Sequence, residues 1–170
     1  MKIQFLSLYL LGSLVCYSQE DLTELDKRNG FKNIKMGMSI DSLEGTVFIK
    51  DIKEKGHFPA KSYDVVHEDY SSIGDVPVNK VSVKAYKGLI YEISVLTAHD
   101  TRLMRGLEST LGKPVYDVRD ESYTWMGKNL TMKFRTAPKK QFELLYSSAV
   151  IKKMMVEDKH KKIGDIAQDF

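Results

Sequence analysis

The most regular alternation of apolar and polar residues runs over two neighbouring segments, Val81–Tyr86 and Leu89–Leu96. A short polar, glycine-containing step, Lys87–Gly88, separates them. A period of two residues on both sides of such a step predicts an antiparallel β-hairpin. The second segment has apolar residues on both faces, which predicts that it lies in the centre of a sheet.

A helical period follows the hairpin. Leu103, Leu107 and Leu111 recur every four residues, with Asp100 in an N-cap position before them and Gly112 as a stop signal after them. This pattern predicts a helix over residues 100–111. We expect its leucine stripe to pack in the core, because a sheet needs a covering layer.

Alternation returns over Ser122–Met126, Asn129–Arg135 and Gln141–Ser147, which predicts a three-stranded meander. The pattern then changes to helical spacing from Ser148 to about Lys159, which predicts a final helix. Residues 160–170 form a charged tail.

The N-terminal half has weaker signals. The stretch "IKMGMSIDSL" predicts a short strand over Ile34–Met38 and a one- or two-turn helix capped by Ser39. Thr46–Ile52 is rich in β-branched residues and predicts another strand. Lys53–Asn79 contains scattered glycine, proline and charge, and predicts long loops around short extended pieces. Long loops inside a compact domain are often functional, so this region is a candidate site.

Together these elements predict a single α+β domain over residues 34–159, preceded by a polar lead-in over residues 19–33. We expect an antiparallel sheet of about five strands, made of the hairpin and the meander. Two or three helices are expected on one face of that sheet.

The first 18 residues have the pattern of a signal peptide. Lys2 is followed by the apolar run Ile3–Val15, and small residues then stand at Cys16 and Ser18. The pattern predicts export, with cleavage before Gln19 and a periplasmic or secreted product. A core element is the alternative, but the abrupt change to a polar sequence disfavours it.

Cys16 also raises the prospect of a lipid anchor, which would make the product an outer-membrane lipoprotein. A lipoprotein signal needs a small residue before the cysteine, and Val15 stands there, so this reading is disfavoured. Cys16 is the only cysteine of the chain. A cysteine-free exported domain fits a bacterial envelope better than a eukaryotic secreted fold, which would usually carry disulfides.

Charge excludes one class of partner. Removal of Lys2 with the signal lowers the 26 basic residues to 25, against 23 acidic residues, for a net charge of +2. A dedicated nucleic-acid binder needs a clustered basic face, so we expect no nucleic-acid partner. After signal removal, no segment is apolar over the roughly 20 residues of a membrane-spanning helix.

Two stretches resemble known envelope proteins. "GMSIDSL" (Gly37–Leu43) and "LGKPVYDVRDESYTWMGKNLTMKF" (Leu111–Phe134) resemble motifs of the outer-membrane barrel-assembly lipoproteins and of the β-lactamase-inhibitor-like fold. The resemblance implies an α+β envelope domain that binds proteins. It implies no functional residue, because the matching positions are of fold-forming types: Gly37, Met38, Leu111, Gly112, Pro114 and Trp125.

Two groups of residues are candidates for a site. His57, His67 and Asp64 offer imidazole and carboxylate groups, which suit zinc or manganese, although their spacing matches no compact ligand motif and a solvated polar loop is the alternative. Tyr123 and Trp125 share one face of a strand. Such aromatic residues either pack in the core or anchor a partner.

No motif of a hydrolase, metalloprotease or nucleotide-binding enzyme is present in the sequence. The leading hypothesis is therefore a non-enzymatic module that binds an envelope protein, without a cofactor. A small-ligand or metal-binding module that uses His57 and His67 is the alternative. A hydrolase with an unrecognised site is the least favoured.

Overall fold

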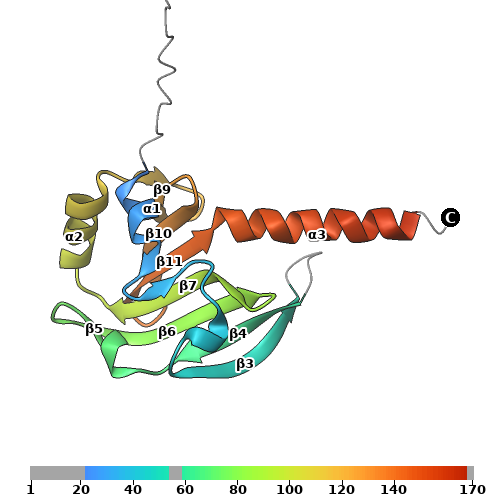
Figure 1. Ribbon diagram of the computed structural model, residues 1–170. Coiled ribbons are helices and arrows are strands. Elements are labelled where there is room, and N and C mark those ends of the chain that lie inside the picture. Colours follow the sequence, from blue (N-terminus) through green and yellow to red (C-terminus); the bar gives the residue numbers. More distant parts are fainter. Residues whose placement is uncertain (1–21, 54–58, 168–170) are drawn as a thin grey trace, which may run out of the picture.

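The computed structural model describes residues 22–53 and 59–167, and its centre is a nine-stranded antiparallel sheet (Figure 1). The strand order is β3-β4-β6-β7-β11-β10-β9-β8, and β5 pairs with β6. The strands of this sheet are β3 (Thr46–Lys53), β4 (Pro59–Val65), β5 (Ser72–Ile73), β6 (Val76–Tyr86), β7 (Leu89–Ala98), β8 (Val115–Asp117), β9 (Ser122–Met126), β10 (Leu130–Ala137) and β11 (Gln141–Ser148).

A separate two-stranded sheet joins β1 (Gly30–Phe31) to β2 (Ile34–Lys35). The helices are α1 (Glu24–Arg28), α2 (Arg102–Leu111) and α3 (Ala149–Ala167), with 3-10 turns η1 (Ile40–Ser42) and η2 (Glu68–Tyr70). The α+β class and the antiparallel sheet are thus confirmed. The expected number of about five strands is wrong.

The predicted hairpin and meander both form. The hairpin is β6–β7, and the meander is β9–β10–β11. Strand β11 pairs with β7, so the two motifs join into one continuous sheet with β7 near its centre. The cap at Ser39 also forms, because its hydroxyl oxygen accepts a hydrogen bond from the backbone N–H of Asp41 over 3.3 Å.

The described part of the predicted loop region, residues 59–79, is more regular than expected. Strand β4 lies between β3 and β6, so it is an internal strand and not part of a loop. Its sequence, PAKSYDV, places Lys61, Ser62 and Asp64 among the paired residues and so lacks the apolar alternation that marks a strand. Pairing on both sides therefore overrides a weak local preference.

The described part of the polar lead-in, residues 22–33, packs against the rest of the domain. The Thr23 hydroxyl caps α1, and Leu25 and Phe31 are buried. The buried carboxylate of Asp26 accepts hydrogen bonds from the backbone N–H groups of Lys128 (2.7 Å) and Asn129 (2.8 Å). These bonds fix α1 to the turn between β9 and β10.

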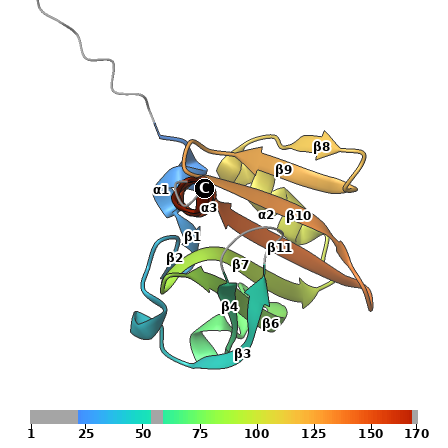
Figure 2. The same cartoon turned by 90° about the vertical axis from the view of Figure 1, so that its right-hand side faces the viewer.

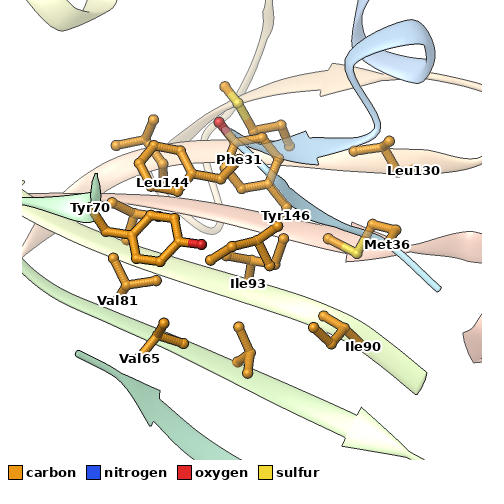
Figure 3. Packing of buried hydrophobic residues seen from close by; sticks show 14 of the residues in the cluster. Phe31, Met36, Val65, Tyr70, Val81, Ile90, Ile93, Leu130, Leu144 and Tyr146 are labelled. Carbon is orange, nitrogen blue, oxygen red and sulfur yellow. The ribbon is translucent and has the colours of Figure 1, made fainter. Parts of the chain in front are cut away.

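The main core lies on the face of the sheet that α1, α2 and η1 cover. Figure 3 shows part of it, with Ile93 and Val81 from the central strands, Leu144 and Tyr146 from β11, and Phe31 above them. Leu103 of α2 is buried in the same cluster.

Helix α3 lies on the opposite face. Ile151 and Met155 pack with Ala60, Tyr86 and Tyr91 in a second cluster. Tyr86 follows Ala85 of the main core, and successive side chains of a strand point to opposite faces. The expectation that all helices cover one face is therefore wrong.

The outer half of α3 extends away from the sheet (Figure 1), and Figure 2 looks along its axis. The helix continues to Ala167, further than the predicted end near Lys159. None of the helices in the described residues is long and apolar enough to span a membrane.

Candidate functional site

Trp125 is not a surface anchor. Its side chain is only 4% exposed, and its indole N–H donates a hydrogen bond to the carbonyl oxygen of Gly112 over 2.7 Å. Trp125 thus connects β9 to the end of α2 and packs in the core, which is the alternative to contact with a partner. Tyr123 is 38% exposed, and its ring centroid lies 4.9 Å from that of Tyr116 on the edge strand β8.

The predicted metal ligands have other roles. The Nδ1 atom of His67 accepts a hydrogen bond from the backbone N–H of Asp69 and caps η2. The carboxylate of Asp64 pairs with the ammonium of Lys80 over 2.8 Å. His57 lies outside the described residues. Within residues 22–53 and 59–167, no three His, Cys, Asp or Glu side chains are grouped as metal ligands.

The leucine stripe of α2 borders a cavity. Leu103 is buried. Leu107 and Leu111 also pack against the core cluster but are only half-buried, because they line a cavity of about 510 Å³ among α2, α1 and the sheet. This volume is within the range of roughly 300–1,000 Å³ that is typical of small-molecule sites. We call this cavity the α2 groove.

The walls of the α2 groove come from five parts of the chain. Its floor is Leu144 and Tyr146 of β11, and one wall is α2. The opposite wall is α1 with β1, and the turn from β5 to β6 closes one end. The apolar lining residues are Leu25, Phe31, Ile73, Val76, Leu103, Leu107, Leu111 and Leu144.

Local sequence explains why the groove stays open. Leu103 packs in the core near the start of α2, and Trp125 holds Gly112 at its end, so both ends of the helix are fixed. Between them, Gly106 has no side chain to fill the space, and a Cβ added there would meet no atom within 4 Å. The middle of α2 therefore borders open space.

The floor of the groove contains an unsatisfied polar group. Tyr146 is 6% exposed, and its hydroxyl has no hydrogen-bond partner among the described residues. Figure 3 shows it beside Phe31, and the two ring centroids are 6.5 Å apart. Burial raises the pKa of Tyr146 to about 12, although the nearby positive charge of Arg28 acts to lower it. The hydroxyl is thus protonated at neutral pH and can donate a hydrogen bond.

The rim of the groove is positively charged. Arg28, Lys32, Lys35 and Arg102 stand around it, with Asp75 as the only carboxylate in the lining. Arg102 is engaged by Asp100, at 2.6 Å, and by Asp75, at 3.0 Å. The ammonium groups of Lys32 and Lys35 donate to backbone carbonyl oxygens.

Arg28 differs from the other three cations of the rim. Its side chain is exposed, and no carboxylate pairs with its guanidinium in the part of the chain that the structure describes. A positive charge that forms no ion pair is therefore available beside the groove, although it also acts on the carboxyl of Glu24 and helps to lower its pKa.

Comparison with protein-family models, with curated proteins and with solved structures found no match. The candidate site therefore depends on the geometry of this chain alone. The likeness to barrel-assembly lipoproteins stays a prediction.

The sequence pattern points to part of the α2 groove. It places Phe142, Leu144 and Tyr146 on one face of a strand and the leucines on one face of a helix, and these two faces do meet. It does not indicate that a cavity remains beside their contact. It also gives no reason to include Arg28 or Phe31, because the polar composition of segment 19–33 conceals its contribution to the fold.

Proposed function

We propose that this protein is a non-enzymatic binding protein that holds an apolar chain in the α2 groove. The observation that carries the proposal is the cavity itself, about 510 Å³ in volume and lined mainly by leucine, isoleucine, valine and aromatic side chains. An apolar ligand in a groove of this size would make close dispersion contacts with the lining side chains. Burial of the ligand's apolar surface would supply the driving force.

The test uses the uncharged fluorescent probe N-phenylnaphthylamine, whose emission rises in apolar surroundings. We expect saturable binding to the purified chain, and we expect Gly106→Leu to abolish it. Gly106 lines the groove, and no atom lies within 4 Å of a Cβ added there, so a larger side chain at this position has room at its base. Leucine is also a better helix former than glycine, so the variant should fold.

Gly164→Leu is the matched control. Gly164 lies on the exposed outer half of α3, where an added Cβ also meets no atom within 4 Å. The control should bind the probe like the unaltered chain. Equal loss in both variants, or binding that Gly106→Leu does not change, would refute the assignment to the α2 groove.

A second candidate function is contact with an envelope protein at the β8–β9 edge of the sheet. It is favoured by a set of exposed apolar side chains there, namely Val115, Tyr116, Val118, Tyr123 and Met126. We expect an exported chain with a photo-crosslinking residue in place of Tyr123 to capture one protein. The additional substitution Tyr116→Asp should prevent this capture. Capture that survives Tyr116→Asp, or that occurs equally from position Val156 on α3, would contradict this contact.

A further inference from the structure

The α2 groove is mainly apolar, but its floor contains one polar group, and this group indicates the chemistry of the ligand. The Tyr146 hydroxyl is a hydrogen-bond donor on the floor of the groove, in a side chain that is 6% exposed. In the described residues the only fully buried side-chain polar atom without a partner is Ser122 Oγ, so the Tyr146 hydroxyl is not sealed in the core and can be reached from the groove. A ligand that enters this groove therefore gains from an acceptor at this point.

The positive charge at the rim of the groove favours an acceptor that is negatively charged. The four cations and one carboxylate of the lining give a local charge of +3. Arg28 and Tyr146 both line the groove. An acceptor that lies between these two groups would receive a hydrogen bond from the phenol and a charge-assisted contact from the guanidinium, and both contacts favour an anion.

We infer that the natural occupant is a small amphiphile, an alkyl or acyl chain with one anionic head group, whose head lies at Tyr146 and Arg28 and whose chain lies against the leucines of α2. This inference depends on the proposed function and specifies its ligand class. A carboxylate and a phosphate monoester share the required chemistry.

A peptide fits the groove less well. Each of its residues would bring a backbone N–H and a C=O group that need partners when buried. Apart from the charged rim, the lining offers few side-chain hydrogen-bonding groups, chiefly those of Thr110 and Tyr146. An alkyl chain carries no such groups, so it can occupy the apolar wall without an unsatisfied polar atom.

The experiment is isothermal titration calorimetry with four probes of equal chain length, each below its micelle-forming concentration. The probes are dodecanoate, dodecyl phosphate, dodecanol and dodecyltrimethylammonium. We expect the two anions to bind at least about tenfold more tightly than dodecanol, as a charge-assisted hydrogen bond allows. The cationic probe should bind most weakly, because the rim repels it.

Two variants locate the head group. Tyr146→Phe and Arg28→Gln should each lower the affinity for dodecanoate about tenfold. Arg28→Gln should leave the affinity for dodecanol unchanged. The control Arg119→Gln removes one exposed positive charge near the β8–β9 edge and should alter neither affinity.

Tyr146→Phe also provides a check on folding. The hydroxyl has no partner, so its removal should leave the melting temperature unchanged or raise it. A lower affinity in a variant of undiminished stability would exclude a general loss of structure.

The possible outcomes separate this inference from the proposed function. Equal affinity for all four head groups, with binding still abolished by Gly106→Leu, would overturn the anionic ligand and leave the apolar site standing. No binding of any probe, including N-phenylnaphthylamine, would overturn both. Tighter binding of an acidic, leucine-rich peptide than of dodecanoate would also overturn the small amphiphile. So would a solution mass of twice that of one chain together with no probe binding, because a second copy of the chain would then occupy the groove.

Discussion

Asp26 is the buried charge that fixes α1, and its replacement by alanine should destabilise the whole domain. The carboxylate is in a residue that is 6% exposed. It accepts hydrogen bonds from the Thr23 hydroxyl over 2.8 Å and from the backbone N–H groups of Lys128 and Asn129 over 2.7 and 2.8 Å. The two backbone donors belong to the turn between β9 and β10, about a hundred residues further along the chain.

The magnitude follows from these contacts. Alanine at position 26 would leave two backbone N–H groups without an acceptor, and each such group costs about 1–3 kcal/mol. We therefore expect Asp26→Ala to lower the free energy of unfolding by about 2–6 kcal/mol. This loss is a large part of the total stability of a typical domain.

Urea unfolding, followed by the fluorescence of the single tryptophan, measures this loss. Asp165→Ala is the control, because Asp165 is an exposed carboxylate on the outer half of α3. The control should change the free energy of unfolding by less than about 0.5 kcal/mol. If the free energy of unfolding of Asp26→Ala differed from that of the unaltered chain by no more than this, the assignment of Asp26 as the anchor of α1 would be wrong.

The contribution of Asp26 should also depend on pH. Burial acts to raise the pKa of its carboxyl, but the hydrogen bonds from Asn129, Lys128 and Thr23 together hold the pKa below the ordinary value of 3.8. A lowered pKa in the folded state means that the stabilisation is present above pH 3.8 and is lost as the pH falls below that value. The difference in stability between the unaltered chain and Asp26→Asn should therefore shrink in acid. A difference that grows in acid would contradict this sign.

Three further substitutions test other contacts of the fold. Gly127→Ala should lower the free energy of unfolding by about 1–3 kcal/mol, because its Cβ would lie 2.6 Å from the carboxylate oxygens of Asp26. Urea unfolding that does not change in this variant would contradict the close approach. Trp125→Phe loses the indole hydrogen bond and should cost about 1 kcal/mol by the same assay; loss of partner capture without any loss of stability would restore a surface role. Asp158→Asn weakens the acceptor of the Tyr86 hydroxyl, so amide exchange of α3 should accelerate while exchange of the central strands does not. If α3 of Asp158→Asn exchanged its amide hydrogens as slowly as α3 of the unaltered chain, its apolar contacts alone would be holding it in place.

The elements that the sequence predicts best are those in which one face is apolar. Both β6–β7 and β9–β11 alternate, because one face of each packs in the main core. Beyond the small cluster of Tyr86 and Tyr91 under α3, the other face carries polar side chains, such as the ion pair of Lys84 and Glu92. The helix α2 has its leucines at helical spacing for the same reason. Local pattern is informative where burial differs between the two faces.

The elements that the sequence does not predict are held by pairing or by a few tertiary bonds. Strand β4 has little alternation and depends on its two neighbouring strands. Helix α1 has only five residues and is positioned by Asp26. The edge strand β8 exposes both Val115 and Tyr116. Because both of its faces are exposed, its sequence does not alternate between apolar and polar residues. Such features depend on residues far away in the chain, which a local pattern does not show.

The candidate site has the same limitation. Trp125 is a plausible anchor by residue type, but its direction is set by Gly112, 13 residues earlier. The α2 groove exists because α2 is held at both ends and carries Gly106 in the middle, which is a property of the assembled layers. Tyr146 gives an inward-facing signal in the sequence, but only the structure reveals that its hydroxyl lacks a partner.

The most direct test of the central claim is a paramagnetic relaxation measurement by methyl NMR, with a dodecanoate that carries a nitroxide on its chain. If the α2 groove holds the chain, the methyl signals of Leu103, Leu107, Leu111 and Leu25 should broaden, and Gly106→Leu should abolish the broadening. The methyl signals of Val156 and Ile163 on the exposed side of α3 should stay sharp. Broadening on α3 or at the β8–β9 edge, with sharp signals from the leucines of α2, would contradict the account.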